Sequence, residues 1–146
     1  MLSHFSKIIR NRPLLAVEHM MYILLVSAGV WGLLPGNNSI TVERLVGQFG
    51  VFVVTMQYSV FLLVGLYGHL SIITVRIENR TVTSMLAFFA FAYGLVSNAV
   101  ILIFSGIFNP ISTMLYTFAG LVAGIIYLHL KTHQRLGVRG RQRYMK

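Results

Sequence analysis

The stretch TVTSMLAFFAFAYGLVSNAVILIFSGIFNPISTMLYTFAGLVAGIIYLHL covers residues 81–130 and contains no Lys, Arg, Asp or Glu. The hydrocarbon core of a bilayer is about 30 Å thick, and a helix needs roughly 20 apolar residues to cross it. The stretch is therefore too long for one helix and suits two. Asn109-Pro110 predicts the break, because the residue before a proline avoids the helical region. We expect helices over about residues 82–107 and 111–130.

Two further apolar runs precede this stretch. The first covers residues 13–34, with Pro13 in the first turn, where its missing N–H costs nothing, and turn-forming residues at 35–39 to end it. The second is uncharged from 45 to 75. It is longer than a span requires, so we expect it to tilt or to protrude into the cytoplasm, with residues 47–71 in the membrane.

The composition indicates one all-α membrane domain over residues 1–146. Hydrophobic residues make up 56% and charged residues 10% of the chain, against about 25% charged residues in soluble domains. The absence of cysteine excludes disulfides and thiolate metal sites. There is no aspartate, paired carboxylate motif, phosphate loop or nucleophile elbow. We therefore expect no catalytic residues, no metal and no cofactor. A cleaved signal peptide is the alternative interpretation of the first segment.

The distribution of Lys and Arg predicts the orientation, because cytoplasmic loops of membrane proteins are enriched in them. Only Arg44 falls in a connection predicted to lie outside the cytoplasm. The basic residues on the predicted cytoplasmic side are Lys7, Arg10, Arg12, Arg76, Arg80, Lys131, Arg135, Arg139, Arg141, Arg143 and Lys146. We expect both termini in the cytoplasm, the chain in the inner (plasma) membrane, and a basic tail, residues 131–146, on anionic lipid of the inner leaflet. In a soluble protein a net charge of +9 would indicate nucleic acid; here we expect none.

Three titratable residues are candidates for proton chemistry, because ionisable groups in a membrane are costly and often functional. Glu18 is the only acid inside a predicted span, near its cytoplasmic edge. It either exchanges protons or is an interfacial acid that reaches water or pairs with a cytoplasmic arginine. His69 and His129 are expected at similar depth near the ends of the second and fourth helices, with His19 on the first. They suggest a relay, a metal site or a haem site, or rings in the headgroup region.

Gln57 and Asn98 fall near the middle of the second and third helices. Such amides form hydrogen bonds between helices or line a hydrated path, and Gln57 is the first candidate for a pore-facing residue. Small residues four apart indicate close helix contacts, within one chain or between chains. These pairs are Ala28 and Gly32, Ala90 and Gly94, and Gly120 and Gly124.

These features predict a non-enzymatic membrane component that forms a homo-oligomer or joins a larger membrane protein complex. A holin-like pore is one form of it, since the chain is similar to holins in being short, multi-span and basic-tailed. A proton-coupled transporter is the first alternative: small multidrug transporters resemble this chain in having four helices and a glutamate in the first, although Glu18 lies at the edge of its span. A haem- or quinone-associated anchor using His69 and His129 is the second.

Overall fold

The computed structural model is all-helical and describes residues 13–34, 40–73, 77–106 and 108–144, except the side chains of 40–42, 44, 48 and 137–144. Its helices are α2 (Pro13–Leu33), α3 (Ile40–Ile73), α4 (Ile77–Ser105) and α5 (Pro110–Tyr144). Each contains a segment long and apolar enough to cross a membrane. The chain is therefore a multi-pass membrane protein built as a helical bundle.

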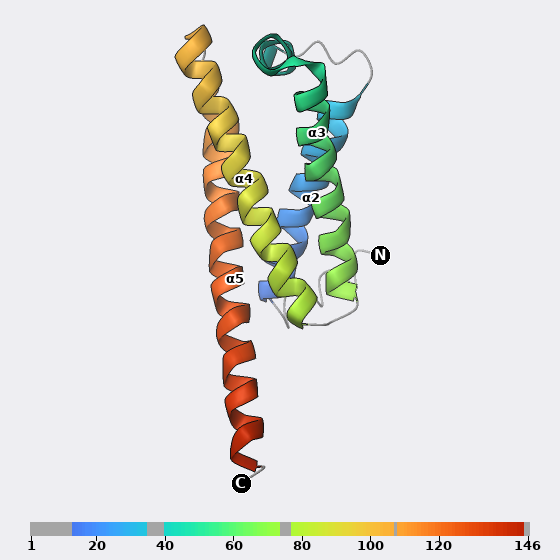
Figure 1. Cartoon of the computed structure of the whole chain (residues 1–146), viewed down its shortest axis with the longest axis vertical. Helices are drawn as coiled ribbons and strands as arrows, with labels where there is room; N and C mark the ends of the chain where they lie inside the picture. Colours follow the sequence, from blue (N-terminus) through green and yellow to red (C-terminus); the bar gives the residue numbers. More distant parts are fainter. Residues whose placement is uncertain (1–12, 35–39, 74–76, 107, 145–146) are drawn as a thin grey trace.

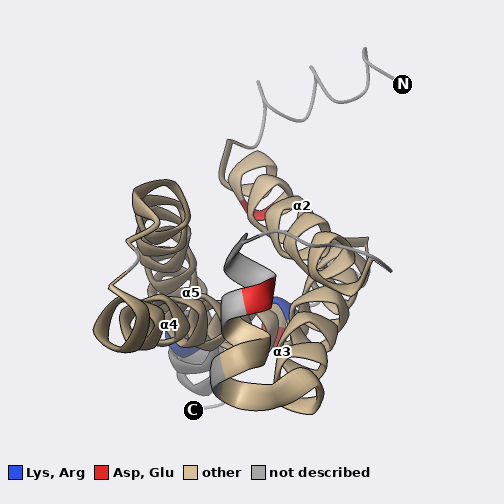
Figure 2. Cartoon of the chain, turned by 90° about the horizontal axis from the view of Figure 1, so that it is seen from above, with Lys and Arg blue, Asp and Glu red and all other residues tan. Residues whose placement is uncertain are grey.

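The bundle consists of two helical hairpins. α2 packs along α3 and α4 packs along α5, while the contact of α3 with α4 joins the two pairs. α2 and α5 contact each other over only a short stretch. Figure 2 shows the two pairs side by side, with α2 and α5 apart on one flank. At one end of the bundle α2 begins, α3 ends and α4 begins (Figure 1), and we call it the α3–α4 end.

α3 contains a kink that the sequence did not predict. Gly50 has φ 79° and ψ 158°, a conformation that lies outside the helix and favours glycine. The part before Gly50 turns across the top of the bundle in Figure 1, and the membrane-spanning segment is Phe49–Ile73. Part of the excess length of α3 is therefore taken up by this bend, at the end of the bundle opposite the α3–α4 end.

The predicted break between α4 and α5 lies where the sequence placed it. Gly106, with φ 65°, ends α4 and donates its backbone N–H to the Leu102 carbonyl at 2.9 Å, a common helix end. Asn109 caps α5, because its side-chain oxygen accepts the Ser112 backbone N–H at 3.1 Å. Pro110 then occupies the first position of α5, where no N–H is needed.

Besides α3, α4 and α5 are also longer than expected. α4 begins at Ile77 rather than near 82, which places Arg80 within the helix. Glu78 lies in its first turn, where a negative charge is favourable. α5 does not stop near 130 but continues through the basic segment to Tyr144, and Figure 1 shows it extending alone past the other helices. The predicted basic tail is therefore helical over its described part.

Large apolar side chains fill the interface between the hairpins, and others cover the outside. Leu25, Phe61, Phe91 and Ile126, one from each helix, are almost fully buried in the core. Large hydrophobic side chains are also exposed on all four helices. Such a surface is unfavourable in water but matches acyl chains.

Candidate functional site: a polar cluster where α2, α3 and α4 meet

Eight polar side chains converge toward the α3–α4 end of the bundle, and we call them the polar cluster. They are Glu18, His19 and Tyr22 of α2, His69 and Ser71 of α3, and Arg80, Thr83 and Ser84 of α4.

The strongest contact of the cluster is an ion pair between α2 and α4. The Arg80 guanidinium donates from Nε to Glu18 Oε2 at 3.0 Å and from Nη2 to Oε1 at 2.6 Å. The Glu18 side chain is 0% exposed and that of Arg80 13%. Such a two-point contact is stronger than a single hydrogen bond, and it gives each buried charge a partner. Both carboxylate oxygens of Glu18 are therefore bound within the protein.

Hydroxyl groups extend the cluster from α2 across α4 to α3. The Tyr22 hydroxyl donates to Thr83 Oγ1 at 2.9 Å and lies 3.4 Å from Ser84 Oγ. Ser71 Oγ lies 3.1 Å from Thr83 Oγ1. Ser84 also donates to the Arg80 carbonyl, one turn back along α4. Because hydroxyls in hydrocarbon need partners, these contacts favour one arrangement of the three helices.

Two histidines face each other across α2 and α3. The Nδ1 atoms of His19 and His69 are 3.2 Å apart, and the rings stack with centroids 5.3 Å apart and 29° between their planes. The Tyr22 ring meets His69 edge-on at 6.0 Å. A hydrogen bond between two Nδ1 atoms requires one protonated nitrogen and one acceptor. The two nitrogens therefore cannot both carry a proton and keep this contact.

Glycines allow α2 and α3 to approach closely beside the cluster. A Cβ on Gly68 would overlap the Tyr22 ring, and one on Gly29 would lie 2.6 Å from the Leu62 backbone nitrogen. Sequence reasoning missed both glycines and also Tyr22, Ser71, Thr83 and Ser84. The run of hydroxyl residues immediately after Arg80 was the available signal, because it places polar groups at the start of an apolar span.

The structure brings together only part of the predicted titratable layer. Glu18 and His69 both belong to the polar cluster, with His19 beside them. His129 does not: it is exposed on α5, with its ring 4.5 Å from that of His133. His129 therefore does not complete the layer as expected: of the two helices of the second hairpin, α4 and not α5 supplies the third side of the cluster. Among the described residues, no group of three or more His, Asp or Glu side chains could hold a metal ion.

The two central amides connect helices. Gln57 is buried and accepts a hydrogen bond at 3.3 Å from Ser97 of α4. Asn98 donates from Nδ2 to the hydroxyls of Ser112 at 2.9 Å and Thr113 at 3.3 Å, both on α5. The amide groups therefore join α3 to α4 and α4 to α5.

The predicted small residues make their contacts within one chain. On α2, Ala28 packs on the core, and a Cβ on Gly32 would overlap the Tyr58 ring of α3. On α4, Ala90 is buried, and a Cβ on Gly94 would lie 2.9 Å from Tyr116 of α5. On α5, a Cβ on Gly120 would lie 3.4 Å from Phe91, and one on Gly124 would lie 3.4 Å from Phe88. These contacts use the small residues for packing inside the bundle.

The basic residues divide between the interior and the extension of α5. Arg80 is used in the ion pair. Lys131 donates to the Tyr127 hydroxyl at 2.6 Å and lies 5.0 Å from the centre of that ring, while Arg135 is exposed. For the remaining residues predicted to contact headgroups, either the whole residue or its side chain lies outside the described part of the chain. These are Arg10, Arg12 and Arg76, and Arg139, Arg141 and Arg143.

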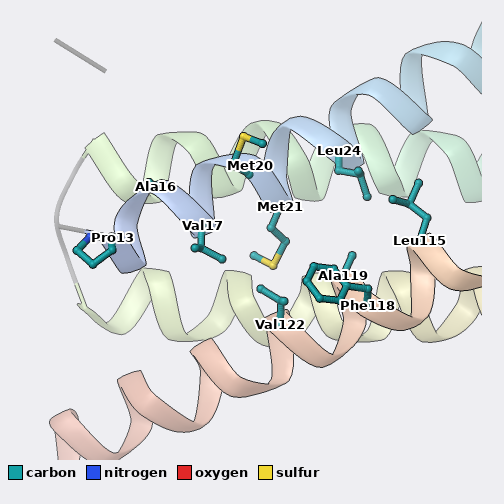
Figure 3. Close-up of a pocket in the computed structure, with 10 residues that line it drawn as sticks. All are labelled: Pro13, Ala16, Val17, Met20, Met21, Leu24, Leu115, Phe118, Ala119 and Val122. Carbon is teal, nitrogen blue, oxygen red and sulfur yellow. The ribbon is translucent and has the colours of Figure 1, made fainter. Parts of the chain in front are cut away.

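The flank between α2 and α5 contains an apolar groove of about 700 Å³. α2 lines it with side chains from residues 13–24 and α5 with side chains from residues 115–122, all of them apolar. Figure 3 shows the side chains of Val17, Met21 and Leu24 of α2 and of Leu115 and Val122 of α5 pointing into the space between the two helices. We call this feature the α2–α5 groove. It and the polar cluster lie on different faces of α2.

No family model matches this chain, and neither a curated protein nor a solved structure is similar to it.

Proposed function

We propose that the chain is a non-enzymatic membrane component that works by associating with copies of itself or with a larger membrane protein complex. The observation that supports this proposal most is that the polar side chains within the spans bind to one another between helices of the same chain. Glu18 is fully buried with both oxygens bound by Arg80, and Gln57 and Asn98 bond to neighbouring helices. These groups hold the bundle together, and large hydrophobic side chains predominate on the outward surface of the described residues. Such a chain is suited to contacts with other membrane-embedded molecules.

We propose further that both termini face the cytoplasm and that the chain lies in the inner membrane. The α3–α4 end and the C-terminal part of α5 point the same way (Figure 1). Of the described basic residues, Arg80 lies near the start of α4, and Lys131 and Arg135 lie in that part of α5. By the positive-inside rule this side is cytoplasmic. The C-terminal part of α5 then projects past the bundle on the cytoplasmic side, with Lys131 and Arg135 near anionic headgroups or a partner. A reporter enzyme that works only outside the cytoplasm should be active when it is fused near Asn37 or Asn109. Activity at either position of a reporter that works only in the cytoplasm would contradict the orientation.

Association can be tested by cysteine crosslinking, because the natural chain has no cysteine. Single cysteines at the exposed positions Leu63, Val96 and Leu121 sample α3, α4 and α5, and one at the buried Ala123 is the matched control. With iodine, an oxidant that enters the bilayer, we expect a disulfide-linked dimer at one or two of the exposed positions and none at Ala123. Purely monomeric chains at all exposed positions, together with a single monomeric species in mild detergent, would contradict association.

A holin-like pore is a narrower form of this proposal. A pore requires several copies of the chain to turn polar groups toward a shared water-filled path. Gln57 and Asn98, the amides suited to line such a path, form hydrogen bonds inside the bundle instead. We therefore expect cells that express the chain strongly to keep their membrane potential. An abrupt loss of potential that a Gln57→Leu variant abolishes would instead establish the pore.

Proton-coupled transport is the second candidate, because an ion pair at membrane depth is itself a feature of transport sites. The buried pair of Glu18 and Arg80, next to the pair of His19 and His69, is the observation that favours it. In proteoliposomes with an imposed pH gradient, a transporter would dissipate the gradient when its substrate is added. A Glu18→Gln/Arg80→Gln double variant that folds and still transports would show that Glu18 is not the coupling group.

A further inference from the structure

We propose that His129 and His133 of α5 form a binding site for a divalent transition-metal ion such as Ni²⁺, Cu²⁺ or Zn²⁺. The sequence predicts a fourth helix that ends near residue 130, which would leave His133 outside it. In the structure α5 continues to Tyr144, so the two histidines lie one turn apart on one face of the same helix. This site does not depend on the association proposed above.

The two imidazole rings are placed to bind one ion together. Their centroids are 4.5 Å apart with 68° between the ring planes, and both side chains are exposed. Two nitrogen ligands of one metal ion lie roughly 3 Å from each other, since each is about 2 Å from the ion. Small rotations of the two rings therefore bring one nitrogen of each to a common ion. Metalloproteases hold zinc with two histidines at this same spacing on a helix.

The basic residues of this part of α5 lie away from the histidines. At 3.6 residues per turn, residues two positions apart lie on nearly opposite sides of a helix. Lys131 is two positions from each histidine, and it donates to the Tyr127 hydroxyl on its own side of α5. Arg135 is two positions from His133. The nearest cations along α5 therefore do not occupy the face on which a metal ion would bind.

The ligand chemistry selects the class of ion. Neutral imidazole suits zinc, copper and nickel, whereas Mg²⁺ and Ca²⁺ require oxygen ligands. Residues 110–146 contain no acid that could supply a carboxylate from α5. Two protein ligands leave the other coordination positions to water, as at open metal sites. The pair is therefore suited to a transition metal and not to Mg²⁺.

A bound ion would also stabilise the C-terminal part of α5. This part extends past the other helices (Figure 1), and a helix without tertiary packing is only marginally stable in water. The two histidines meet at one ion only when the turn between them is helical. Metal binding and helix formation are therefore coupled here, and the ion should make residues 131–144 more resistant to local unfolding.

Calorimetric titration of the full chain with NiCl₂, in mild detergent after treatment with a chelator, tests the site. The matched variant is His133→Gln/Gln134→His, which keeps the composition but moves the second histidine five positions from the first, onto another side of α5. We expect the natural chain to bind Ni²⁺ at least about tenfold more tightly than this variant, because losing even an outer-shell partner of a metal ligand costs 10–100-fold in affinity. MgCl₂ should show no binding.

Equal Ni²⁺ affinities of the natural chain and the exchanged variant would overturn the proposal. His129→Gln, also at an exposed position, provides a second variant should the exchanged one fail to fold. Hydrogen exchange then tests the coupling to helix formation. Saturating Ni²⁺ should slow amide exchange over residues 131–144 in the natural chain and leave it unchanged in the variants. Exchange that Ni²⁺ does not slow in the natural chain would overturn the stabilisation of α5.

Discussion

The two faces of α2 differ in polarity and in what they contact. The face toward α3 and α4 carries Glu18, His19 and Tyr22, each bonded to a residue distant in sequence. The face toward α5 carries only apolar side chains and borders a groove. In a membrane, polar groups stabilise contacts that exclude lipid, whereas a surface open to lipid has to be apolar. We call the side of α2 that packs on α3 and α4 the closed face, and the side that borders the groove the open face. The closed face therefore fixes the arrangement of helices, and the open face remains available to a ligand.

The largest effect is expected from breaking the ion pair on the closed face. Arg80→Gln leaves the fully buried Glu18 carboxylate without its charged partner. Removing one member of a buried pair typically costs about 3–5 kcal/mol. The free energy of unfolding, measured by denaturant titration in mixed micelles, should fall by this amount.

Two variants control this prediction. The double variant Glu18→Gln/Arg80→Gln removes both charges and should recover most of the loss, because no unpaired charge remains. Glu78→Gln changes an exposed acid at the same end of the bundle and should have little effect. Equal stability of Arg80→Gln and the unmodified chain would show that the closed face is not organised by this pair.

A smaller effect is expected from separating α2 and α3. In Gly29→Ala the new methyl group would lie 2.6 Å from the Leu62 backbone nitrogen, so the helices have to move apart. Overpacking of this kind costs about 1–3 kcal/mol. Gly124→Ala is the control, since its methyl group would make an ordinary contact with Phe88 at 3.4 Å. Equal unfolding free energies for the two variants would contradict the close approach of α2 and α3.

Removing one hydroxyl from the closed face should lower the free energy of unfolding by a still smaller amount. Tyr22→Phe deletes the donor to Thr83 and the contact with Ser84. A typical hydrogen bond contributes about 0.5–1.5 kcal/mol, and the unfolding free energy should fall within this range. Tyr67→Phe, at an exposed position of α3, is the matched control and should leave stability unchanged.

The smallest effect is expected on the open face. Met20 is exposed at the groove, so Met20→Ala should alter the unfolding free energy by less than about 0.5 kcal/mol, as is usual for exposed positions. A large loss of stability in lipid-free detergent would mean that this face is part of the packed core, and the distinction between the two faces of α2 would fail.

The membrane-spanning helices of the described residues and most of their limits could be predicted from the sequence, because transfer of a segment into lipid depends on its own residues. The uncharged stretch of residues 81–130 required two spans, and Asn109-Pro110 marked the break. Pro13 likewise marked the beginning of α2. Glu18 and His69 were also identifiable as candidates, because titratable groups are rare in apolar segments.

The partners of these residues were decided by the tertiary structure alone. Glu18 and Arg80 are 62 positions apart, and His19 and His69 are 50 apart. Which side chains meet depends on the rotation of each helix about its axis and on the glycines that set the spacing of α2 and α3. The same rotation leaves His129 outside the polar cluster and opens the α2–α5 groove, because packing between distant segments is not a property of any one segment.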